Sequence, residues 1–179
     1  EVRIVNQSSR ELPFENGFYD FLWQGGFGFP SMRTDTVNNF LIQQEGSTVI
    51  TLAKTVAQEI AGDPASLLPE YQSSQTRMLY GKNVGWVGVG QKYFMSAIVP
   101  KTPTLQALEG IAAPGSHARG NWKPNVGVRM EVGSLGPGNS RTDKFILYVG
   151  PINEDDLALA GEGLQDARQI FLRSIIGPI

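Results

Sequence analysis

The sequence predicts a mostly β fold, an antiparallel β-sandwich followed by one or two C-terminal α-helices. Three observations support this fold class. Short apolar segments alternate with turn-forming stretches, and the 179 residues include 21 glycines and 11 prolines. Residues 84–100 form the longest apolar stretch, which holds hardly any charge and ends in a proline. Amphipathic helical spacing is clear only near the end of the chain.

The composition excludes several classes of function. Lys and Arg number 15 against 17 Asp and Glu, so the chain lacks the clustered positive charge on which non-specific nucleic-acid binding depends. Cysteine is absent, which excludes disulfides, thiolate metal sites and a cysteine nucleophile. No apolar run has the length of a membrane span, and no signal segment opens the chain. Because Glu1 begins in the middle of a strand pattern, we expect a piece of a longer protein.

The N-terminal part predicts a strand and then an aromatic region. Val2 to Val5 is a β-branched run that ends near Asn6, where residues 6–8 also match a glycosylation sequon of the kind that chance often produces. Residues 14–29 interleave aromatic side chains with glycines. They fit aromatic packing at the edge of a sandwich, which we favour, or a stacking platform for an apolar or sugar ligand.

A β-hairpin is predicted in the next segment. Residues 39–43 and 48–54 read as strands around a turn at residues 44–47, which contains a glycine. Residues 55–60 fit a strand or a helix equally well, because periodicity does not separate the two over so short a run. The glycine and proline at residues 62–64 end this segment, and a loop is expected to follow.

Residues 84–100 are too long for one strand, since about five or six residues are typical. The glycines and the lysine within residues 88–92 offer a break, so we predict two strands joined there. Counting by twos puts two sets on opposite faces: Trp86, Gly88, Gly90, Lys92 and Phe94 on one, and Val87, Val89, Gln91, Tyr93 and Met95 on the other. Both sets are largely apolar, so both faces should be covered, with the C-terminal helices received by the glycine strip beside Trp86.

The C-terminal half predicts two more strands and then the helices. Residues 126–132 alternate apolar and small or charged side chains, which indicates a half-exposed antiparallel strand. A turn at residues 134–140 leads to an apolar strand at residues 144–149. Asn153 and the acidic residues after it are typical of a helix N-terminus, and this helix should end near Ala160.

The spacing of the apolar residues predicts that the last segment is an amphipathic helix, and we predict that its apolar side is an interaction surface. The residues on this side are Leu164, Ala167, Ile170, Phe171 and Ile175.

No catalytic constellation is visible. The lone histidine, His117, lies in a turn-rich stretch without a Ser-His-Asp order or a second histidine. The acidic cluster at residues 154–156 is explained by its place at a helix start, and adjacent exposed carboxylates lack the opposed environments that acid–base catalysis needs. The phosphate-binding, zinc-protease and serine-hydrolase motifs are absent. We therefore expect no enzyme, no catalytic residue, no metal and no cofactor.

Two motifs carry a resemblance to a known family. Residues 85–100 contain the pattern GW-x-x-x-x-Q-x-YF-x-x-A-x-x-P, and residues 147–151 read LYVGP ahead of an acidic helix start. In these motifs, and in their order, the sequence resembles the periplasmic domain of YidC-type (YidC/Oxa/Alb) membrane protein insertases. The residues that form this family signature are Gly85, Trp86, Gln91, Tyr93, Phe94, Pro100, Tyr148, Val149, Gly150 and Pro151.

The resemblance implies a β-supersandwich related to the galactose-mutarotase-like fold. Residues 1–152 would be the later portion of this sandwich, and residues 153–179 a helical segment packed on it and leading to the membrane. The resemblance also implies a place on the periplasmic face of the bacterial inner membrane, within a multi-pass protein. The glycines at residues 88 and 90 depart from the larger residues that the family often has there.

The function implied by the resemblance is non-catalytic help in inserting and folding inner-membrane proteins. The implied partners are the remainder of the insertase, components of the Sec translocon and nascent membrane proteins. The insertase activity of the family lies in membrane helices that this chain lacks, so no insertase residue is carried over. Two alternatives stay open: a carbohydrate-binding or mutarotase-like sugar-active domain, for which one loop histidine is weak support, and a purely structural spacer.

Overall fold

The computed structural model describes residues 1–14, 17–24, 39–44, 46–66, 76–79, 84–90, 93–104, 106–112, 123–161 and 163–168. Several predictions lie outside these residues. They concern the loop after residue 66, the lone histidine His117, the signature residue Gln91, and the helical positions Ile170, Phe171 and Ile175.

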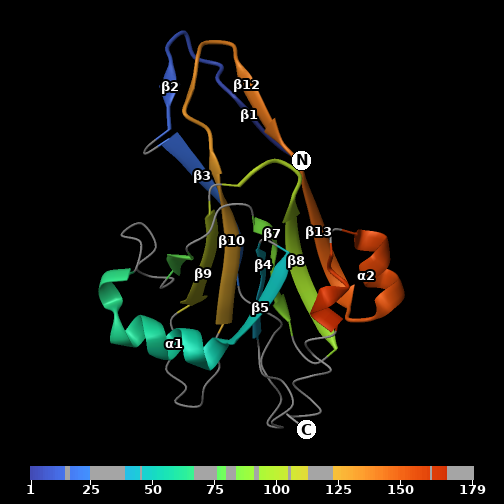
Figure 1. Ribbon diagram of the computed structural model, residues 1–179. Helices are drawn as coiled ribbons and strands as arrows, with labels where there is room; N and C mark the ends of the chain where they lie inside the picture. Colours follow the sequence, from blue (N-terminus) through green and yellow to red (C-terminus); the bar gives the residue numbers. More distant parts are fainter. Residues whose placement is uncertain are drawn as a thin grey trace, which may run out of the picture.

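Two antiparallel sheets form the body of the protein (Figure 1). The four-stranded sheet has the order β3 (Phe18–Gln24), β10 (Lys123–Glu131), β9 (Gln106–Ala112), β6 (Thr76–Leu79). The five-stranded sheet has the order β13 (Phe145–Pro151), β8 (Phe94–Pro100), β7 (Val84–Gly90), β4 (Asn39–Gln44), β5 (Ser47–Leu52). The predicted mostly β, antiparallel fold class is thereby confirmed, as is the division of the long apolar stretch into two strands.

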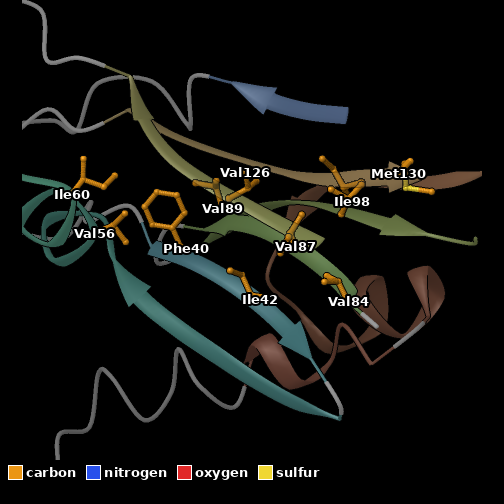
Figure 2. Packing of buried hydrophobic residues seen from close by; sticks show 12 residues of the cluster. Phe40, Ile42, Val56, Ile60, Val84, Val87, Val89, Ile98, Val126 and Met130 are labelled. Carbon is orange, nitrogen blue, oxygen red and sulfur yellow. The ribbon is translucent and has the colours of Figure 1, made fainter. Parts of the chain in front are cut away.

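An apolar core fills the space between the two sheets, as Figure 2 shows for its labelled side chains. Its buried members are Phe40, Ile42, Val56, Ile60, Val84, Val87, Val89, Ile98, Ala107, Val126, Val128 and Met130. Fully burying one large aliphatic or aromatic side chain of this kind stabilises a fold by about 1.5–3 kcal/mol. This cluster is therefore the main source of the sandwich's stability.

Helix α1 (Ala53–Gly62) settles the ambiguous segment after the hairpin. Val56 and Ile60, one helical turn apart, both enter the core between the sheets, so helical packing places them on one side. The strand before the helix ends at Leu52, and the predicted strand to residue 54 was therefore too long. A short 3-10 turn, η2 (Pro64–Ser66), follows the helix.

Helix α2 (Glu154–Ala160) begins and ends as predicted. The side chain of Asn153 accepts a hydrogen bond from the backbone N–H of Asp156 at 2.8 Å, which satisfies one of the free donors at the helix start. Gly161 ends the helix with a φ of 74°, a conformation that glycine adopts without the strain of a Cβ atom.

A two-stranded ribbon projects from the sandwich (Figure 1). In this ribbon β1 (Val2–Val5) pairs with β12 (Ser140–Asp143), and β2 (Leu12–Pro13) pairs with β11 (Ser134–Leu135). The side chain of Asn6 holds its corner: the amide nitrogen donates to the carbonyls of Arg10 and Leu135, at 2.8 and 2.7 Å. Asn6 is only 2% exposed, so its sequon nitrogen is occupied and inaccessible in the folded protein.

The prediction that residues 126–132 form a half-exposed strand is wrong for most of their length. Residues 124–130 of β10 are buried, including Arg129 at 3% exposure, since β10 lies inside the sheet between β3 and β9. The Arg129 guanidinium pairs with the carboxylate of Asp20, its direct cross-strand neighbour, at 2.7 Å and lies over the ring of Phe18. A buried charge that is paired in this way keeps its hydrogen bonds. Arg129 can therefore be buried, although we predicted that its side of the strand faces water.

The predicted assignment of faces within residues 84–100 is correct for Trp86, Val87 and Val89 but wrong for Phe94 and Met95. The register between β4 and β7 shifts so that Gln43 faces Trp86 while Gln44 faces Val84. This irregularity returns Val84 to the same face as Val87. The alternation also does not continue from β7 into β8, since Met95 lies on the face of Trp86 and Phe94 on the opposite face.

Candidate functional site at the helix-covered face of the sheet

The outer face of the five-stranded sheet carries a second apolar cluster, called here the Trp86 face. The sheet contributes Leu41, Trp86, Met95, Ala97 and Val99, and the C-terminal segment contributes Leu157, Leu164 and Ala167, all buried. Residues that are 70 or more positions apart in the sequence, such as Trp86 and Leu157, therefore share one core. The C-terminal helical segment is fixed to the sandwich through this cluster.

Trp86 is the largest fully buried side chain of the described residues. Its indole nitrogen finds no hydrogen-bond acceptor, although buried tryptophans usually do. The side chain of Trp86 is therefore stabilised by its apolar contacts, while its backbone belongs to the β4–β7 ladder. Because an orphaned donor costs free energy, the gain from packing the ring between sheet and helices must exceed that cost.

The glycines beside Trp86 serve the sheet itself. A Cβ atom on Gly88 would lie 2.5 Å from the carbonyl oxygen of Ser96 on the neighbouring strand β8. Leu157, Leu164 and Ala167 lie over this face, but the close approach at Gly88 is made by β8. Gln43 also reaches toward the helical segment: its side chain occupies the space beside Gly85, and its amide nitrogen is 3.6 Å from a Cβ position at Gly163.

The two signature motifs lie side by side in the sheet. Strand β13 pairs with β8 so that Pro151 faces Phe94, and the N–H of Ile152 donates to the carbonyl of Tyr93 at 2.7 Å. Tyr148 donates its hydroxyl to the carbonyl of Pro151 at 2.5 Å. A Cβ atom on Gly150 would stand 2.9 Å from that hydroxyl, so glycine leaves room for the tyrosine. Burial and the charge of Asp156 raise the pKa of Tyr148, which keeps this donor protonated.

The structure divides the remaining predicted residues between core and surface. Leu164 and Ala167 are fully buried against the Trp86 face, so within this chain they contact the sheet. Tyr93, Phe94 and Val149 are large, exposed members of the signature, at 63%, 51% and 58% exposure, and Pro151 is exposed as well. Their role stays a prediction.

A polar cluster that the sequence did not reveal joins the ribbon to the sandwich. The Asp143 carboxylate accepts hydrogen bonds from Tyr19 at 2.7 Å, Thr102 at 3.1 Å and Arg141 at 2.7 and 3.0 Å. Burial alone would raise the pKa of Asp143, but hydrogen bonds from Arg141 and Tyr19 and the charge of Arg141 outweigh it, so the pKa is lowered. Burial and the bond to this carboxylate raise the pKa of Tyr19. Spacing in the sequence does not indicate this cluster, because Tyr19 on β3 and Thr102 after β8 lie far along the chain from Arg141 and Asp143 on β12.

The described residues bring no three His, Cys, Asp or Glu side chains together in a way that could hold a metal ion. Asp143 already accepts from several donors, so it is poorly suited to act as a base. None of the helices in the described part of the chain has the length and apolarity of a membrane span.

Comparison with known proteins relates the sequence of this chain to a family. The family model of the YidC periplasmic domain matches residues 3–169. A membrane protein insertase YidC of Chlorobium phaeovibrioides is 30% identical over 141 residues, which cover 76% of this chain and 21% of the relative. The protein of the same name from Thiobacillus denitrificans is 26% identical over 167 residues, or 93% of this chain and 27% of the relative.

Fold and site together define an antiparallel β-sandwich with helices packed on the outer face of one sheet. With residues 3–169 matched, the chain belongs to the YidC periplasmic domain family. The matched region corresponds to 21% and 27% of the two relatives' lengths, so most of each relative lies beyond the part that this chain resembles.

Proposed function

We propose that this chain is a non-catalytic periplasmic domain of a membrane protein insertase at the bacterial inner membrane. In this proposal it assists the insertion and folding of inner-membrane proteins through contacts with the rest of the insertase, with Sec-translocon components or with nascent chains. Family membership and the names of the relatives support this proposal.

The Trp86 face supports the part of the proposal that concerns how the sandwich is connected to the membrane part of the protein. Residues 1–152 act as the sandwich and residues 153–179 as the helical segment that connects it to the membrane part of the protein. Leu157, Leu164 and Ala167 pack on the sheet around Trp86, so the orientation of the sandwich is transmitted to the helices without a flexible joint between them. The observation that carries the proposal is this burial of both helical pieces against one sheet face.

The test uses the full-length insertase as the sole copy in cells. Leu164→Ser removes a fully buried contact of the helical segment, whereas Leu159→Ser changes a residue on α2 that is 87% exposed. We expect Leu164→Ser to impair membrane protein insertion and Leu159→Ser to leave it intact, with equal protein levels checked by immunoblotting. Phe171→Ser with Ile175→Ser extends the test to the predicted interaction surface. Normal insertion by the Leu164 variant at normal abundance would contradict the coupling.

A further inference from the structure

Strand β13 forms one edge of the five-stranded sheet, and its hydrogen-bonding pattern follows from the bonds at its two ends. The N–H of Lys101 donates to the carbonyl of Lys144 at 2.8 Å, and the N–H of Ile152 donates to Tyr93 at 2.7 Å. Hydrogen-bonded pairs alternate along an antiparallel ladder, so the even-numbered residues of β13 bond to β8. The backbone N–H and C=O groups of Phe145, Leu147 and Val149 therefore point away from β8.

No strand of the described residues pairs with this outer edge. Edge strands are usually guarded by charged side chains, prolines or bulges. The sequence of β13, FILYVGP, contains no charge, and its only proline stands at the last position. Pro151 lacks an N–H, and its carbonyl accepts the Tyr148 hydroxyl, so the edge is closed at that end alone.

The outward-pointing residues also carry exposed apolar side chains. Leu147 and Val149 are 52% and 58% exposed. They alternate with Ile146 and Tyr148, which pack on the Trp86 face, and so they point to the same side as Phe145, which packs against the core between the sheets. Their cross-strand neighbours on β8, Ile98 and Ser96, are buried, so the exposure on this side is at the β13 edge, and the exposed ring of Phe94 lies on the same side.

We propose that β13 binds an extended, uncharged, apolar polypeptide segment as an added strand of the five-stranded sheet. The donors and acceptors of Leu147 and Val149 repeat at the spacing of a strand backbone, and another extended backbone is the partner that satisfies them in series. The exposed side chains of the same residues favour apolar neighbours over charged ones. This inference rests on the proposed function, since it assigns the class of partner: an unfolded apolar segment such as a nascent membrane protein exposes.

The test measures amide hydrogen exchange by NMR on the 179-residue chain with a synthetic peptide of alternating Val and Thr, lysine at each end. The amides of Leu147 and Val149 should exchange rapidly in the free protein. At a peptide concentration about ten times the dissociation constant, their exchange should slow about tenfold. The amides of Tyr148 and Gly150 already bond to β8 and should change little. A peptide N-methylated at every residue, which has no N–H to donate from either edge, should have no effect.

Variants at the two opposite edges of the same sheet supply the matched controls. Val149→Lys charges the β13 edge, and Val149→Pro removes an outward N–H while leaving the ladder to β8 intact, so both should abolish protection. Val149→Thr keeps the N–H and the β-branch and should bind. Val49→Lys places the same charge at a residue of similar exposure, 57%, on the opposite edge strand β5 and should bind normally.

Three results would overturn the assignment: slow exchange of Leu147 and Val149 in the free chain, no protection by the peptide, or equal loss of binding in the two lysine variants. The proposed function is tested separately by the Leu164 variant in cells. Failure of peptide binding with a clear Leu164 effect would reject the edge site alone.

Discussion

The sandwich and the ribbon are stabilised by different interactions. In the sandwich, apolar side chains fill the space between the sheets and beneath the helices. The ribbon has one layer of two strands and buries few apolar side chains: Leu135 is buried, but Val5 and Leu12 remain 41% and 39% exposed. Its order depends instead on two buried polar residues, Asn6 at the corner and Asp143 at the base. The thickness of a region thus decides whether packing or hydrogen bonding holds it.

The largest effect is expected from Trp86→Ala in the sandwich. Removing a fully buried large side chain leaves a cavity and costs about 3–5 kcal/mol of unfolding free energy. Urea denaturation of the 179-residue chain measures the loss. Trp86→Phe should cost much less, because the indole nitrogen makes no hydrogen bond and its removal relieves an unsatisfied donor. A larger loss for Phe than for Ala would contradict the view that Trp86 acts by packing.

A smaller effect is expected from Asp143→Asn at the base of the ribbon. Hydrogen bonds to a charged group contribute about 1.5–3 kcal/mol, and several of them weaken when the carboxylate becomes an amide. We expect a loss of about 2–3 kcal/mol near neutral pH, since Arg141 keeps partial access to water and recovers some solvation. Urea denaturation measures this loss too.

The pH dependence of this loss tests its electrostatic origin. The pKa of Asp143 is lower in the folded state than the ordinary value of about 3.9, so the folded state releases this proton more readily than the unfolded state. The contribution of the ionised carboxylate is therefore complete above about pH 5 and declines as the pH falls through the folded pKa. The difference between wild type and Asp143→Asn should shrink on acidification, and a constant difference down to about pH 2 would contradict the assignment.

This contrast also explains what could be predicted from the sequence. The apolar strands, the turn before β12 and the Asn153 cap follow from local patterns, because each depends on neighbours within a few residues. The burial of Arg129 depends on Asp20, which lies more than 100 residues away, and Asp143 accepts from Tyr19 and Thr102, 124 and 41 residues away. Asn6 followed by serines looks like any polar turn. Polar pairs between residues far apart in the sequence leave no periodic signal, so the partners of Arg129 and Asp143 could not be predicted.

The smallest effect, and the most local, is expected from Asn6→Ala at the ribbon's corner. The substitution removes donors to Arg10 and Leu135 and an acceptor for the Ser8 amide, and it leaves those backbone groups to find water. We expect about 1–2 kcal/mol. The ribbon corner can open while the sandwich stays folded, because the two regions do not share a core. Amide exchange of Gly138, whose N–H donates to the Asn6 carbonyl, should therefore accelerate, while the buried strands β7 and β8 keep their protection. Equal acceleration in both regions would show that ribbon and sandwich unfold as one unit, so that their different interactions do not give them separate stabilities.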